Sequence, residues 1–164
     1  MPKPEIEGSC WLWWAVLILT VPLPWLGAVC IAGLIHELGH YAAVRLLGGN
    51  IIAISVGCSG ICMEASGLST PRSIAASLAG PLAGLLPMFA VSLLPLTAFC
   101  GIIQSIRNLL PLGNTDGSHI LQAVLTAFIG EDRAGRICRR VSGFLWGFLL
   151  ILSGIILYRL NRLL

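Results

Sequence analysis

One long apolar stretch near the start of the chain constrains the fold more than any other feature. Residues 10–47 are largely apolar, and their main interruption lies at residues 36–40. A membrane-spanning helix needs about 20 apolar residues, so this stretch is too long for a single span. Pro22 and Pro24 mark the break, because proline lacks a backbone donor and ends helices. We therefore expect a short first helix near 9–22 and a second helix near 26–47.

Composition supports a membrane protein. Of the 164 residues, 57% are hydrophobic and only 10% are charged, whereas a soluble domain carries roughly a quarter charged residues. This balance excludes a disordered chain, a nucleic-acid binder and a typical soluble enzyme. The length fits one membrane-embedded domain over residues 1–164. The net charge of +3 indicates no polyanionic partner, so we expect no nucleic acid.

The rest of the chain predicts three further spans and a short hairpin. The β-branched residues of the segment 51–63, punctuated by glycine, are typical of two short strands. The remaining expected elements are a polar loop at 64–72, a third span at 72–99 kinked at Pro87 and Pro95, a fourth span at 101–129 broken at 107–108 and 111–117, a charged loop at 131–140 and a fifth span at 141–158. The predicted fold is therefore an all-α multi-pass membrane protein of about five transmembrane helices. It has a membrane-associated β-hairpin after the second helix and a broken fourth helix.

Basic residues predict the orientation. Cytoplasmic loops carry an excess of Lys and Arg. With the N-terminus in the cytoplasm, the inner side collects Lys3, Arg45, Arg72, Arg133, Arg136, Arg139 and Arg140, and the outer side only Arg159 and Arg162. We therefore expect an integral membrane protein with a cytoplasmic N-terminus.

The interruption at residues 36–40 reads His36-Glu37-Leu38-Gly39-His40. This is an H-E-x-x-H motif on a predicted helix, and its i, i+4 spacing stacks two imidazoles on one face, where both can bind one Zn²⁺. Glu37 lies on the adjacent flank, where it can act as a base without being a ligand. Two core histidines bonded to neighbouring helices are the alternative. Within lipid this alternative is disfavoured, because intramembrane ionisable groups are costly and mark functional sites.

Catalytic zinc usually takes three protein ligands, and the third must come from elsewhere in the chain. Asp116 is the preferred candidate, because it lies in the break of the fourth predicted span, where Gly117 lets the turn aim its carboxylate. An Asp-Gly turn or helix cap is the structural alternative. An ion pair with Arg107 is the strongest rival. His119 is an alternative ligand, a group beside the ligands or a residue lining a cavity, with the ligand role the least favoured of the three. Glu64 falls in a predicted loop.

These motifs together resemble the site-2 protease family of intramembrane zinc metalloproteases. His36-Glu37-Leu38-Gly39-His40 is similar to its first motif, and Asn108-Leu109-Leu110-Pro111 with Asp116-Gly117 is similar to its N-x-x-P…D-G motif. The segment 77–83 resembles its A-G-P segment. The resemblance covers residues 26–130, the expected catalytic core, and the size is most like the sporulation-type branch.

The resemblance implies a set of roles. His36, His40 and Asp116 would bind one Zn²⁺ per chain, and Glu37 would be the catalytic base. Gly84 stands where the family often has Asn, and Asn114-Thr115 replaces a Pro- and Leu-rich approach to Asp-Gly. We expect Asn108 to bind the extended substrate backbone or else to cap its own helix. The Gly80–Gly84 pair, spaced as G-x-x-x-G, is interpreted as helix packing.

The predicted function is zinc-dependent cleavage of a transmembrane or membrane-tethered protein within the bilayer. The substrate would be a transcription-factor or anti-sigma-type regulator, and a regulatory membrane partner would control the reaction. The predicted location is a bacterial cytoplasmic membrane. The alternatives are a non-catalytic membrane zinc-binding or adaptor protein, and a zinc protease that uses Glu64 as its third ligand.

Overall fold

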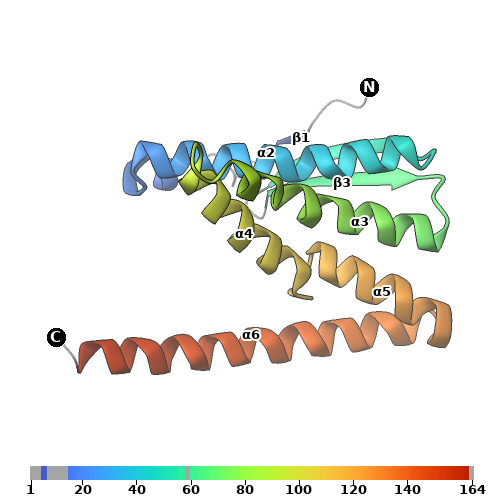
Figure 1. Ribbon diagram of the computed structural model, residues 1–164. Coiled ribbons are helices and arrows are strands. Elements are labelled where there is room, and N and C mark those ends of the chain that lie inside the picture. Colours follow the sequence, from blue (N-terminus) through green and yellow to red (C-terminus); the bar gives the residue numbers. More distant parts are fainter. Residues whose placement is uncertain (1–4, 7–14, 58–59, 163–164) are drawn as a thin grey trace. The chain divides into compact units, whose positions relative to one another are not determined.

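The computed structural model describes residues 5–6, 15–57 and 60–162. Most of these residues are helical, as the sequence predicts (Figure 1). The chain divides into two compact units, Met1–Ile106 and Arg107–Leu164. The first unit holds a small sheet and the helices α2, α3 and most of α4, and the second holds α5 and α6.

The first unit confirms the break at the proline pair. Residues 15–20 are helical, the helix ends at Val21, and α2 (Leu23–Leu46) begins directly after Pro22. Pro24 lies in the first turn of α2, where a missing backbone donor costs nothing. The helix therefore begins slightly before the expected residue 26. Residues 9–14 of the expected first helix lie outside the described part of the chain.

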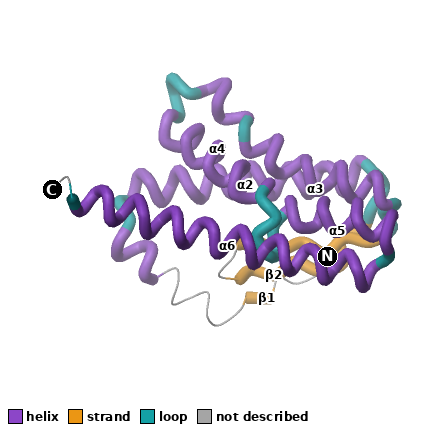
Figure 2. The backbone as a smooth tube through the Cα atoms, turned by 90° about the horizontal axis from the view of Figure 1, so that it is seen from below, coloured by secondary structure: helices purple, strands orange, loops and turns teal. Residues whose placement is uncertain are grey.

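The expected hairpin is present. Strands β2 (Asn50–Gly57) and β3 (Gly60–Ser66) pair antiparallel, from Asn50 opposite Ser66 to Gly57 opposite Gly60. Figure 2 shows the strands in orange. The ladder keeps residues 64–66 in strand conformation, so the expectation that the loop begins at residue 64 was wrong. A short parallel strand, β1 (Glu5–Ile6), lies on the other edge of β2, and the sequence did not predict it.

The expected third span is not one helix. It divides into α3 (Thr70–Gly84), a 3₁₀ turn η1 (Leu86–Ala90) and the start of α4 (Pro95–Leu109). Pro87 lies inside the turn, and Pro95 opens α4, where its ring suits the first helical position. The prolines expected to kink this span therefore end one helix and begin another. The predicted start of α3 at Ser69-Thr70-Pro71 is confirmed.

Small residues bring the helices of the first unit into close contact. A Cβ atom on Gly39 of α2 would lie 2.6 Å from the Ala79 carbonyl oxygen of α3 and 2.5 Å from the Ala83 methyl. The Ser105 hydroxyl of α4 donates to the Pro81 carbonyl of α3 at 2.8 Å. This bond satisfies one of the carbonyls left without a helical donor at the end of α3. Glycine at residue 39 therefore lets α2 pack closely on α3, and the buried Ser105 hydroxyl bonds α4 to α3.

The second unit is a helical hairpin. Helix α5 (Asp116–Ile129) packs against α6 (Glu131–Asn161), and Gly130 joins them with a φ of +81°. A break in the expected fourth span is confirmed at residues 110–115, between α4 and α5. Residues 107–108 and 116–117, which were also expected in the break, are helical, so that part of the prediction was wrong. The expected charged loop at 131–140 was wrong: these residues form the first turns of α6. Arginine and glutamate are good helix formers, and Glu131 and Asp132 suit the positive N-terminal end of the helix.

Three helical stretches of the described chain are long and apolar enough to cross a membrane: Leu23–Leu46, Thr70–Ala90 and Glu131–Asn161. The expected number of five spans is not confirmed, since α4 and α5 have only 15 and 14 residues. Large apolar side chains such as Phe144 and Phe148 of α6 are exposed. This exposure is unfavourable in water but suits lipid, as expected of an integral membrane protein.

Candidate metal centre

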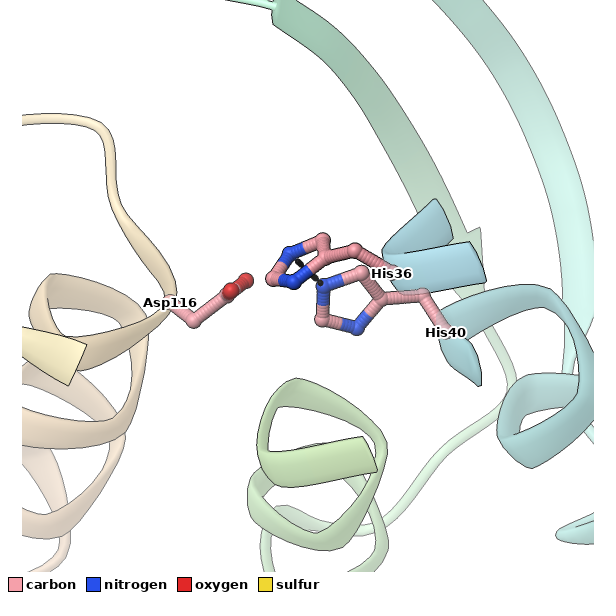
Figure 3. A group of neighbouring side chains, drawn as sticks. All are labelled: His36, His40 and Asp116. Atoms are coloured by element: carbon pink, nitrogen blue, oxygen red, sulfur yellow. Dashed lines mark hydrogen bonds between the residues drawn. The ribbon is translucent and has the colours of Figure 1, made fainter. Parts of the chain in front are cut away.

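Helix α2 places His36 and His40 one above the other. Ala28, Ala32 and His36 follow at intervals of four residues and are all buried, so this face of the helix is turned into the protein. His36 is only 2% exposed. The Nε2 atoms of His36 and His40 lie 3.1 Å apart (Figure 3). The predicted pairing of two imidazoles on one helix face is therefore present in the structure.

A carbonyl group of α3 fixes the orientation of the His40 ring. The Nδ1 atom of His40 lies 2.8 Å from the Ala76 carbonyl oxygen. A carbonyl can only accept, so Nδ1 carries the hydrogen and donates it. In the neutral ring Nε2 then keeps its lone pair, and this lone pair points to the side where Nε2 of His36 lies. Metal-binding histidines are typically held in this way, by a second hydrogen bond from the other ring nitrogen.

The spacing of the two nitrogen atoms fits a zinc ion. Two zinc ligands at about 2.1 Å, separated by a tetrahedral angle, lie roughly 3.4 Å apart. The observed Nε2–Nε2 distance of 3.1 Å is close to this value. At this separation both nitrogen atoms could bind one ion.

In the second unit, a threonine hydroxyl organises the loop before Asp116. The Thr115 hydroxyl donates to the Leu110 carbonyl at 2.6 Å and accepts from the Leu112 amide at 3.2 Å. Its oxygen also lies 3.2 Å from the Ser118 hydroxyl. These bonds bridge the end of α4 and the start of α5, so Asp116 begins α5 at a defined position. Thr115 thus takes part in the turn at which the sequence departs from the family pattern.

Gly117 is required by the same turn. A Cβ atom on Gly117 would overlap the Leu109 carbonyl oxygen and lie 3.0 Å from the Leu110 carbonyl carbon. The prediction that Gly117 gives the turn freedom is therefore refined. Its φ is not positive, so it is the close approach of the backbone that calls for glycine.

A His/His/Asp set, composed of His36, His40 and Asp116, could bind a metal ion (Figure 3). Two neutral imidazoles and a carboxylate are a donor set that zinc accepts. The structure therefore supports metal binding in general terms, and zinc itself stays a prediction.

The other candidate residues lie at separate places. Glu37 is half-buried on α2, and Asn108 is half-buried in the last turn of α4. Their predicted roles toward the reacting groups stay predictions. The side chains of Arg107, His119 and Glu64 are exposed, with Glu64 on strand β3 rather than in a loop.

Two residues that contact His40 were not predicted. They are Ala76, through its carbonyl, and Gly80, whose backbone lies against the ring. A backbone carbonyl leaves no mark in the sequence. The spacing of Gly80 and Gly84, equal to that of the histidines, was the one available signal.

No protein-family model and no curated protein sequence matches the chain. Among solved structures, its fold is similar to that of a site-2 protease from Methanocaldococcus jannaschii, with a TM-score of 0.73 and 19% sequence identity. The match covers 96% of this chain and 82% of that one. At this identity, the likeness establishes a shared fold over nearly the whole chain.

Proposed function

We propose that this chain is a zinc-dependent endopeptidase of the site-2 protease family, which cleaves membrane proteins within the bilayer. One observation carries the proposal. The two imidazoles of an H-E-x-x-H motif meet at 3.1 Å on a helix that is long and apolar enough to cross a membrane. Such polar groups are costly at that depth unless they serve a function. The shared fold gives the proposal independent support.

We assign His36, His40 and Asp116 as the residues that hold one zinc ion. The donor set and the fixed tautomer of His40 support this assignment. When bound, the ion lowers the pKa of a water molecule and polarises the scissile carbonyl.

Glu37 is assigned as the general base. Its carboxylate takes a proton from the attacking water, whose oxygen forms the new bond to the carbonyl carbon. The C–N bond of the substrate then breaks, and Glu37 passes the proton to the leaving amine. The motif supports this assignment, because Glu37 follows His36 directly and is offset from the face that carries both histidines.

The proposed substrate is a transmembrane or membrane-tethered protein, such as a transcription-factor or anti-sigma-type regulator. A helical substrate must unwind before its carbonyl can react. Within the described strands β3 has an open edge, since β2 lies between β1 and β3. An extended substrate segment could add to that edge by backbone hydrogen bonds, and Asn108 is proposed to bind the same segment.

The proposed location is a bacterial cytoplasmic membrane, with the N-terminus in the cytoplasm and a regulatory membrane protein as a partner. The arginines at the start of α6 support a cytoplasmic start of that helix, since they precede its apolar part.

The substitution Glu37→Gln tests the function. We expect release of membrane-tethered proteins into the soluble fraction to fall at least about 100-fold, because the proton acceptor is lost, while the purified variant keeps its zinc. The measurement compares proteins released from cells that make the wild-type chain, Glu37→Gln or the control Leu38→Ala. Leu38 is half-exposed beside Glu37, and we expect its variant to behave as wild type.

Release at the wild-type rate by Glu37→Gln would sink the protease assignment. A wild-type chain that binds zinc but releases no protein would instead favour the adaptor alternative, because a binding site alone has no need of Glu37.

A further inference from the structure

We infer that α3 seats the imidazoles of α2, and that Gly80 is a positioning residue for the metal ligand His40. This inference rests on the proposed function, since it concerns the same metal site. It changes the interpretation of the G-x-x-x-G segment, which the sequence alone assigns to helix packing. The inference is carried by contacts within the first unit, where α2 and α3 pack together.

The His40 ring lies directly against the backbone of Gly80. A Cβ atom on Gly80 would overlap Nε2 of His40 and lie 2.6 Å from its Cδ2. The three atoms closest to that position all belong to the imidazole, and one of them is the nitrogen expected to bind the ion. Any side chain at residue 80 would therefore push the ligand atom itself.

One helical turn earlier, Ala76 supplies the second half of this seat. Its carbonyl oxygen accepts the hydrogen on Nδ1 of His40 at 2.8 Å. The hydrogen bond sets the rotation and tautomer of the ring, and the bare backbone at Gly80 leaves room for the edge that carries Nε2. The two contacts together hold the lone pair of Nε2 on the side of His36.

The glycines of α3 and the histidines of α2 are in register. Gly80 faces His40, and Gly84 faces His36, because the two helices run in opposite directions (Figure 1). Gly80 and Gly84 differ in how close the facing imidazole lies. A Cβ atom on Gly84 would lie 3.6 Å from Nδ1 of His36, an ordinary contact, and 2.6 Å from the Ser105 hydroxyl.

Helix packing alone does not account for Gly80. The close approach of the two backbones occurs at Gly39, where a Cβ atom would meet the Ala79 carbonyl oxygen and the Ala83 methyl. At Gly80 the neighbouring atoms belong to a polar ring. Packing therefore explains Gly39, and seating of the ligand explains Gly80.

Metal binding by Gly80→Ala tests the inference. We expect the affinity for Zn²⁺, measured by competition with a chelator in detergent, to fall about 10- to 100-fold, as for other groups that orient a ligand. The visible absorption bands of bound Co²⁺ should also shift, since they report the ligand geometry. The control is Gly27→Ala on α2, where a Cβ atom meets nothing within 4 Å. Wild-type Zn²⁺ affinity and Co²⁺ bands in Gly80→Ala would overturn the inference.

A second background separates seating from folding. In a His40→Ala chain the ring is absent, so adding Gly80→Ala should leave the melting temperature unchanged, whereas the same change lowers it in the wild-type chain. An equal loss in both backgrounds would assign Gly80 to packing and overturn the inference. Gly84→Ala should keep the wild-type Zn²⁺ affinity, because its added methyl group would meet the Ser105 hydroxyl rather than the His40 ring. None of these tests measures proteolysis. A chain that binds Zn²⁺ but cleaves no substrate would therefore contradict the proposed function and leave the role of Gly80 intact.

Discussion

Asp116 is the residue on which the proposed metal site most depends. Two histidines four residues apart supply two ligands, and catalytic zinc usually takes three from the protein. Asp116 opens α5 after a loop that the Thr115 hydroxyl holds together. A first-turn aspartate also stabilises a helix by itself, through its charge at the positive end. A role of Asp116 as a metal ligand and a role in stabilising α5 therefore predict different effects when its side chain is removed.

We expect Asp116→Ala to weaken Zn²⁺ binding by about 100-fold or more, because a ligand is lost rather than a supporting group. Arg107→Ala is the matched control, since it removes the rival ion-pair partner and should leave zinc content unchanged. The measurement is zinc per chain after purification in detergent. Unchanged zinc in Asp116→Ala would leave the ion-pair or helix-cap interpretation standing. Zinc lost from Glu64→Ala instead would favour the other ligand.

For single residues, the sequence predicted the placements that follow from the periodicity of a helix. His36 and His40 share a face because four residues make about one turn. The Ala76 carbonyl and the Gly80 backbone could not be predicted, because they act through their position in space and carry no side-chain chemistry. Thr115 was noticed only as a departure from the family pattern, whereas in the structure its hydroxyl bonds both sides of the turn.

Among the elements, the turn between α4 and α5 is tightly constrained. Its backbone passes so close to itself that a Cβ atom on Gly117 would overlap the Leu109 carbonyl oxygen. A carbonyl is part of the main chain and cannot rotate aside as a side chain can. The turn must therefore open to admit even a methyl group.

We expect Gly117→Ala to destabilise the protein by about 1–3 kcal/mol, the usual cost of forcing extra volume into a packed site. The control Gly143→Ala lies in α6, where a Cβ atom has no neighbour within 4 Å. It should be neutral or stabilise slightly, because alanine favours a helix over glycine. Thermal unfolding in detergent measures both. Equal melting temperatures for the two variants would contradict the expected strain.

Element boundaries followed the sequence where local chemistry sets them. The break at Pro22 and the start of α3 at Thr70 depend on proline, which acts on its own backbone. The expected span at 72–99 is present as a candidate span only over Thr70–Ala90. Its predicted end was wrong because the apolar sequence continues past the residue at which this helical stretch ends. The expected loop at 131–140 was wrong because charge indicates exposure, and an exposed segment can still be helical.

The basic residues at the two ends of α6 predict which way the protein is oriented in the membrane. Four exposed arginines, Arg133, Arg136, Arg139 and Arg140, occupy its first turns, and an apolar stretch follows. As one continuous helix, α6 carries this basic end and the pair Arg159 and Arg162 at opposite ends of the same candidate span. The larger basic group is expected on the cytoplasmic side.

We expect Glu131→Cys, in a chain freed of its own cysteines, to react with an impermeant thiol reagent only when the cytoplasmic face is accessible. Asn161→Cys should react from the opposite side. Labelling of intact cells against inverted membrane vesicles measures both, and the unsubstituted cysteine-free chain is the control. The reverse pattern would show that the orientation inferred from the basic residues is inverted.

The proposed metal ligands are synthesised at different times, because they lie far apart along the chain. His36, His40 and their seat at Ala76 and Gly80 all precede residue 85, whereas Asp116 comes more than a helix later. Synthesis proceeds from the N-terminus, so the ribosome delivers a two-nitrogen half-site before the carboxylate exists. A pair of imidazoles is an incomplete zinc site. On the proposed assignment, stable binding of zinc waits for α5, so the proposed protease gains its activity only after that helix has been made.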